Sequence, residues 1–140
     1  GFAHLWSKMA LSTNLRAFQT DGYYIVPANR RGPVDTRAGV DFVAGDVRLD
    51  YFGGEKRLSV KLDVLAEKRE NGTVRQTNST SLGNLSANYS QENFSLMGWH
   101  TREQFHANFS TIAANRLTET KSDVVRIDVA TYTSMWSALM

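Results

Sequence analysis

The stretch VAGDVRLDYFGGEKRLSVKLDVLA, residues 43–66, decides the fold of this chain. Apolar residues take almost every second position on both sides of a central Gly53-Gly54 pair, and mostly polar or charged residues lie between them. A period of two places alternate side chains on opposite faces of a β-strand. Glycine readily adopts the backbone conformations that tight hairpins need. The stretch therefore predicts an antiparallel hairpin with one apolar and one polar face.

The same alternation recurs along the chain and predicts an all-β fold, an antiparallel up-and-down meander of about six strands. We expect residues 1–140 to form a single segment of this kind, a partial barrel of outer-membrane type. The segments with the pattern are residues 8–17, 43–51, 58–66, 85–89, 94–101 and 125–131. A short helix is expected within residues 101–116, because Thr101 followed by Gln104 resembles a capping box and Phe105, Phe109 and Ile112 would line one side.

The connections between the predicted strands differ in length in a regular way. Residues 52–57 and 91–93 form tight turns, whereas residues 18–42, 67–83 and 101–123 form long connections. Alternate connections of an antiparallel meander lie at the same end of the sheet, so the short turns would gather at one end and the long loops at the other. Short periplasmic turns and long external loops are typical of outer-membrane barrels.

Aromatic residues lie near the ends of the predicted strands. Interfacial girdles of a membrane barrel would explain this placement, and so would aromatic residues that cap a water-soluble core. The residues concerned are Phe18, Tyr51, Phe52, Tyr89, Phe94, Trp99, Tyr132 and Trp136.

Composition excludes several functional classes. The chain has no cysteine, which removes disulfides, thiolate catalysis and cysteine-based zinc sites. Its formal net charge is +2 and no run of Lys or Arg occurs, so we expect no nucleic-acid partner. No apolar run approaches the ~18 residues that a membrane-spanning helix needs. If the chain crosses a membrane, it must do so as part of a β-barrel.

Charged residues alternate along the two strands of the Gly53-Gly54 hairpin. They form a ladder on one face, which is either a polar wall that contacts a ligand or lines a lumen, or a wet surface with cross-strand ion pairs. The ladder consists of Asp46, Arg48, Asp50, Lys61 and Asp63. The long connection before this hairpin supplies further candidates for ligand contact, namely Tyr23, Tyr24, Arg30 and Arg31.

His100, Glu103 and His106 are the weak candidates for a metal site. On a strand the two histidines share a face and Glu103 points away, whereas on a helix steps of three residues diverge around the axis. Neither geometry holds three ligands well, so we expect no metal and no cofactor. No nucleophile, base and orienting group can be assembled from the sequence, and we expect no enzymatic activity.

Four stretches carry a further signal. They are TDGYYIVP at residues 20–27, GDVRLDYFG at 45–53, NGT at 71–73 followed by NSTSLG at 78–83, and MGWHTREQFH at 97–106. These stretches resemble the TonB-dependent receptors of the bacterial outer membrane, in particular the acidobacterial type. The similarity runs from about Ser7 to Arg116, and the tail at residues 121–140 matches the family poorly.

The resemblance implies a barrel of about 22 strands with a plug, which imports scarce nutrients with energy from an inner-membrane partner. About six strands leave two unpaired edges and cannot span a bilayer alone. We therefore expect a non-enzymatic fragment of a nutrient receptor barrel in the bacterial outer membrane. Its partners would be the membrane or the remaining barrel strands, and the energy-transducing inner-membrane partner would serve only the full-length receptor.

An alternative function remains open at this point. A soluble β-sandwich or a small β-barrel that binds an unknown ligand would show the same alternation, because a period of two does not distinguish lipid from a second sheet. The unpaired edges would also allow the chain to form a homo-oligomer by strand pairing.

Overall fold

The computed structural model describes residues 1–92, 94–113 and 116–137, with side chains through Ala113 except those of residues 109 and 111. Apart from one short 3-10 helix, the regular structure of this part is entirely β. The elements are β1 (Phe2–Leu5), β2 (Met9–Tyr24), η1 (Ala28–Arg30), β3 (Arg37–Gly53), β4 (Lys56–Glu70), β5 (Thr77–Gln91), β6 (Phe94–Ala113) and β7 (Arg116–Ser137).

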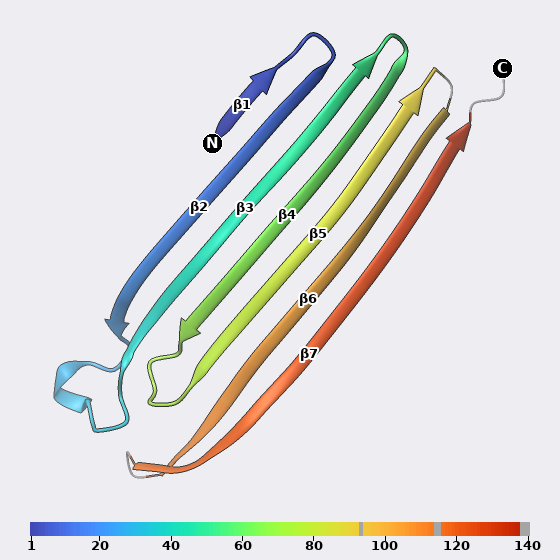
Figure 1. Cartoon of the computed structure of the whole chain (residues 1–140). Helices are drawn as coiled ribbons and strands as arrows, with labels where there is room; N and C mark the ends of the chain where they lie inside the picture. Colours follow the sequence, from blue (N-terminus) through green and yellow to red (C-terminus); the bar gives the residue numbers. More distant parts are fainter. Residues whose placement is uncertain (93, 114–115, 138–140) are drawn as a thin grey trace.

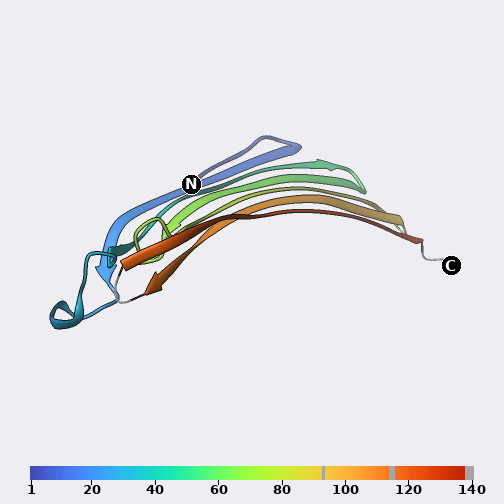
Figure 2. The same ribbon diagram turned by 90° about the horizontal axis from the view of Figure 1, so that it is seen from below.

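All strands belong to one antiparallel sheet, and every strand pairs with its neighbours in the chain, in the order β1-β2-β3-β4-β5-β6-β7 (Figure 1). β1 is a short edge strand of 4 residues, and the other six have 15 to 22 residues. Seen along its edge, the sheet is a single arched layer whose outer strands do not meet (Figure 2). The predicted all-β, up-and-down meander of about six strands is confirmed.

The hairpin predicted from residues 43–66 has the expected register. Val47 lies opposite Leu62, Leu49 opposite Val60, and the pairing continues without a break to Gly53 and Lys56. Gly54, in the two-residue turn, has a φ of 62°, which a residue with a Cβ adopts only at a cost. Gly54 therefore has the backbone conformation for which the sequence predicted a tight turn at this glycine pair.

The short helix expected within residues 101–116 does not form, and this prediction was wrong. Residues up to Ala113 continue strand β6, and residues 114–115 lie outside the described part of the chain. Thr101 caps no helix; its hydroxyl donates a hydrogen bond to Asn84 Oδ1 across the sheet at 2.8 Å. β6 pairs with β5 on one side and β7 on the other, and two ladders of backbone hydrogen bonds outweigh a local capping pattern.

The expected sorting of long and short connections holds only in part. β2 and β3 extend far into residues 18–42, and only residues 25–36 connect them. Residues 71–76 connect β4 to β5. The third expected loop, residues 101–123, consists of strand except for residues 114–115, which are not described. Strand pairing also incorporates most of the tail at residues 121–140, as part of β7.

The described part of the sheet has almost no core. Only two apolar residues are buried, Val34 at 5% and Ala107 at 4% relative exposure. The described strands form neither a sandwich nor a closed barrel, because all of them lie in one open layer. Among the described residues, no helix is long and apolar enough to cross a membrane.

Candidate functional site

One face of the sheet carries a band of apolar side chains, which we call the apolar face. Residues that lie directly opposite in the register point to the same side, so each row crosses β2 to β6. The rows are Met9, Tyr51, Leu58, Tyr89 and Leu96; Leu11, Leu49, Val60, Ala87 and Gly98; Thr13, Val47, Leu62, Leu85 and His100; Leu15, Gly45, Val64, Gly83 and Arg102; and Ala17, Val43, Ala66, Ser81 and Gln104.

Nothing in the described part of the chain covers this band. Leu15 keeps 72% of its surface exposed, Leu85 50%, Val64 49% and Leu62 45%. An uncovered apolar patch of this extent in water marks a surface that meets lipid or a partner.

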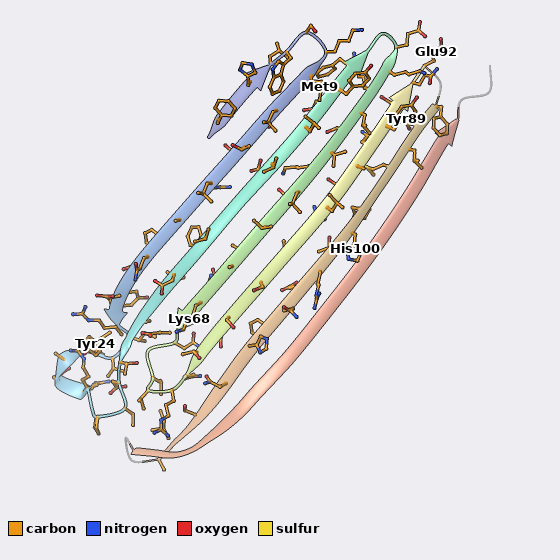
Figure 3. All side chains as sticks on the ribbon, in the orientation of Figure 1. Met9, Tyr24, Lys68, Tyr89, Glu92 and His100 are labelled. Atoms are coloured by element: carbon orange, nitrogen blue, oxygen red, sulfur yellow. The ribbon has the colours of Figure 1, made fainter. Side chains whose placement is uncertain are left out.

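The apolar band runs obliquely across the strands. On β2, β3 and β4 it ends at a row that contains Gln19, Asp41 and Lys68, and Figure 3 shows Lys68 towards the end of the sheet that carries the long loops. On β6 polar residues begin much earlier, at His100 near the middle of the strand. The polar boundary therefore moves towards the tight turns from one side of the sheet to the other.

The opposite face, which we call the polar face, carries the predicted charged ladder. The register places Asp46, Arg48, Asp50, Lys61 and Asp63 together on this side. Asp46 lies directly opposite Asp63, and Arg48 directly opposite Lys61. Neighbouring strands thus face each other with like charges, an arrangement that destabilises a pair of strands.

The ion pairs of the ladder run along each strand. Arg48 Nε donates to Asp50 Oδ2 at 2.8 Å within β3, and Lys61 bonds to Asp63 within β4. The cross-strand ion pairs considered from the sequence are therefore not the ones that form. Residues two apart on a strand share a face. A basic and an acidic side chain two residues apart can therefore pair along the same strand, as they do on β3 and β4.

A row of hydrogen bonds crosses the centre of the polar face. Asn14 Nδ2 donates to Asp46 Oδ2 at 3.2 Å, and Asn84 Nδ2 donates to Asp63 Oδ2 at 3.3 Å. The Thr101–Asn84 hydrogen bond extends this row to β6. Asn14 and Asn84 were not predicted as site residues, and Thr101 was predicted only as a helix cap. The alternation that continues along β2, β5 and β6 is the signal that could have found them.

The long connections pack against each other at one end of the sheet. Thr36 N donates to Gly72 O at 3.0 Å and Val74 N donates to Val34 O at 2.9 Å, so residues 25–36 and 71–76 are joined backbone to backbone. Gly72 has a φ of 78°, and a Cβ there would lie 2.8 Å from Ile25 Cδ1. Backbone hydrogen bonds therefore join the two connections into one loop cluster at this end of the molecule.

The loop candidates are only partly brought together. The Arg31 guanidinium lies 3.6 Å from the centroid of the Tyr24 ring, a cation–π contact, and Arg30 lies in η1. Tyr23 pairs with Ala38 and Tyr24 with Arg37, so the two tyrosines point to opposite sides of the sheet. Arg37, which the sequence reading missed, lies 5.8 Å from the Tyr24 ring.

The histidine candidates follow the strand geometry. His100 and His106 lie on the side of the apolar face and Glu103 on the polar face. Within the described residues, no group of three or more His, Asp or Glu side chains is placed to hold a metal ion.

The aromatic residues divide between the faces. Tyr51 and Tyr89 lie on the apolar face near the tight turns, as does Phe94, and Figure 3 shows Tyr89 and Met9 at that end. Phe18 and Phe42 pair on the polar face, with ring centroids 5.9 Å apart. Only the first group has the placement that an interfacial girdle needs.

The tight turns bring two carboxyl groups together. A hydrogen bond to Glu92, in the β5–β6 turn, raises the pKa of Glu55, in the β3–β4 turn, above its ordinary value, and slight burial acts in the same direction.

The chain matches no protein-family model, no curated protein and no solved structure.

Proposed function

We propose that this chain is a non-enzymatic wall segment of a nutrient receptor barrel in the bacterial outer membrane, of the TonB-dependent class. The observation that carries the proposal is the uncovered apolar face of a single open sheet, opposite a face of charged and hydrogen-bonded side chains. A water-soluble sheet would hide such a face under a second layer. A barrel wall presents it to lipid and turns the polar face inward.

The dimensions agree with a barrel wall. From Met9 to Ala17 the apolar band is about 26 Å long, at ~3.3 Å per residue. A tilt of ~40° reduces this to about 20 Å across the membrane, close to the ~25 Å band of outer-membrane barrels. Strands of 15 to 22 residues exceed the ~10 residues that span a bilayer, so they would extend beyond it, as strands of large receptors do.

The oblique boundary of the band also supports tilted strands. With a tilt of ~40° and ~4.8 Å between strands, a membrane plane crosses each successive strand about one residue further along. The polar boundary lies in one row on β2, β3 and β4 and moves in this sense from β4 to His100 on β6. A sheet packed on a second sheet has no comparable reason for an oblique boundary.

In this proposal the polar face lines the interior of the barrel. Asp46 and Asp63 would contact passing solute or a plug through water, and the along-strand pair of Arg48 with Asp50 would keep the wall close to neutral. The inner-membrane partner that supplies energy would act on the full-length receptor and not on this segment.

The edges of the sheet would join the remaining strands of the barrel. β1 covers β2 only from Ala10 to Thr13, and no described strand pairs with β2 on this side from Asn14 to Tyr24. Pro and Lys, which protect natural edges, are absent from this stretch, and Arg16 is its only cation. Arg16, Asp21 and the bulge before Tyr23 protect this edge only in part. The edge therefore favours a strand partner, either the rest of the barrel or a second copy of the chain.

A pair of single-cysteine variants tests which side meets lipid, since the chain has no cysteine of its own. Val64→Cys lies on the apolar face and its neighbour Leu65→Cys on the polar face of the central strand β4. In detergent micelles, a charged, water-soluble thiol reagent should label Leu65→Cys rapidly and Val64→Cys slowly.

Equal labelling of the two variants in micelles would contradict the membrane function. Protection of Val64→Cys in plain buffer, in a monodisperse sample, would favour the soluble binding module instead. Far-ultraviolet circular dichroism of both variants serves as the control for folding.

A further inference from the structure

The end of the sheet with the long loops carries arginine side chains on the side of the apolar face. β3 is regular between Arg37 and Val43, which are six residues apart, so Arg37 shares the side of Val43. Tyr24 lies directly opposite Arg37 and points the same way. Figure 3 shows Tyr24, the last residue of β2, beside the loop that carries η1. In the proposed barrel these side chains are outside the wall and not in the path of a transported solute.

Two guanidinium groups gather around one aromatic ring at this place. Arg31 stacks at 3.6 Å from the centroid of the Tyr24 ring and Arg37 lies at 5.8 Å. Arg31 Nη2 also donates to Val26 O at 3.2 Å, which holds the guanidinium at a defined position. Arg30 is exposed in η1, and its guanidinium forms no hydrogen bond or ion pair with the described part of the chain.

The nearby carboxylates do not neutralise this group. Residues 21–37 contain three arginines against Asp21 and Asp35, a net charge of +1. Asp35 Oδ2 accepts the Gly32 N–H at 2.7 Å. Asp21 Oδ2 approaches Arg37 Nη1 only to 4.0 Å, and its side chain is 86% exposed. The arginines are thus available to an external anion.

The loop is preorganised for binding. Arg30 N donates to Pro27 O at 2.9 Å within η1, and the Thr36–Gly72 and Val74–Val34 hydrogen bonds fasten the loop to residues 71–76. Binding of a partner would therefore cost less conformational entropy than binding to a mobile loop.

The height of the arginines indicates the kind of partner. Arg37 lies about 20 Å beyond Val43 along the strand, which a tilt of ~40° reduces to about 15 Å above the apolar band. The polar layer of an ordinary phospholipid is only about 6 Å thick on each side. Even an extended arginine side chain would therefore not reach the phosphate of a small headgroup.

We propose that Tyr24, Arg30, Arg31 and Arg37, the arginine patch, bind phosphate groups on lipids with extended, phosphorylated sugar headgroups. The planar guanidinium matches phosphate with paired hydrogen bonds, and basic groups near a membrane are attracted to anionic headgroups. The inference rests on the proposed function, because it requires the apolar face to lie in lipid.

The test compares two lipids that differ by one phosphate. The full chain in nonionic micelles is titrated with phosphatidylinositol monophosphate or with phosphatidylinositol, and with soluble inositol phosphate as a third ligand. Arg30→Gln/Arg31→Gln removes two charges from the arginine patch. Arg16→Gln/Arg57→Gln removes two from exposed positions on the polar face and serves as the matched control.

We expect the phosphorylated lipid to bind more tightly than its partner. Each arginine removed from the patch should weaken that binding about fivefold. The double variant should therefore bind about 25-fold more weakly, while the affinity of the control variant changes little. Arg30→Gln alone should weaken binding of the phosphorylated lipid about fivefold, and its circular dichroism spectrum should equal that of the parent chain.

Three results would overturn the inference: equal affinity for the two lipids, an equal loss in the control variant, or soluble inositol phosphate that competes as well as the lipid. All three leave the proposed function intact as long as the chain associates with micelles. Failure to associate with micelles at all would contradict the proposed function itself.

Discussion

The apolar face and the polar face are made by the same strands, yet their side chains are satisfied in different ways. On the polar face Asn14 bonds to Asp46, and Thr101 bonds to Asn84, so hydrogen bonds cross its centre on both sides of the facing carboxylates. On the apolar face Leu15 and Leu85 remain half exposed or more, and no described element covers them. The comparison teaches that one side is complete in water while the other needs a partner without polar groups.

The largest effect should come from a charge placed on each face of one strand. Leu62→Arg lies in the middle row of the apolar face and Leu65→Arg on the polar face, both on β4. In micelles Leu62→Arg should lower the free energy of unfolding by about 2–4 kcal/mol, the cost of a cation at the centre of a lipid-facing band.

Leu65→Arg should cost less than about 1 kcal/mol, as surface substitutions usually do. Denaturant unfolding of both variants, followed by tryptophan fluorescence, measures the difference. Equal costs for the two variants would remove the distinction between the faces.

A smaller effect of opposite sign is expected at the facing carboxylates of the polar face. Asp46→Asn removes the like charge opposite Asp63, and it should raise the free energy of unfolding by roughly 0.2–1 kcal/mol. The same unfolding experiment at low salt measures it, and added salt should reduce the gain because salt screens exposed charges. A loss of stability would show that Asp46 is needed by Asn14 more than it is repelled by Asp63.

A weaker contribution is expected from the ion pair along β3. A double-mutant cycle with Arg48→Gln and Asp50→Asn isolates the Arg48–Asp50 interaction, which should stabilise the fold by about 0.5 kcal/mol or less, since the pair is exposed. A coupling of zero would leave the alternating charges without a stabilising role, and a coupling well above 1 kcal/mol would indicate that the polar face is buried.

The smallest expected effect is on the pH dependence of the free energy of unfolding, and it comes from Glu55 in the β3–β4 turn. Because Glu92 raises the pKa of Glu55 in the folded chain, the contribution of Glu55 is fully present below its ordinary pKa. It is lost as pH rises through the raised value. Glu55→Gln should therefore flatten this slope, and unfolding curves between pH 4 and neutrality compare the variant with the parent chain. An unchanged slope would mean that the two carboxyl groups do not share a proton.

Local alternation made the class of fold and the central hairpin predictable. Val47, Leu49, Val60 and Leu62 alternate with charges, and only a pleated strand places all of them on one side. The same alternation placed the charged ladder on one face. The helix expected within residues 101–116 failed because Thr101 and Gln104 also suit a strand, and pairing with two neighbours decided between them.

The candidate site was less predictable, because its contacts join residues distant in sequence. Nothing local in Arg37 indicates that it approaches the Tyr24 ring, and nothing local in Asn84 indicates that it bridges Asp63 and Thr101. Both contacts depend on the register between strands, which an extra residue such as the one between Thr20 and Tyr23 shifts.

By itself, the sequence determined that this chain forms strands with two unlike faces, because a period of two is a local property of the backbone. Only the tertiary structure decided that the strands lie in one open layer, that the Arg48–Asp50 pair runs along its strand, and that Arg31 and Arg37 meet at Tyr24 on the side of the apolar face. The physical reason is that these features depend on which strands pair and in what register. Pairing joins residues whose distance in the sequence carries no local signal.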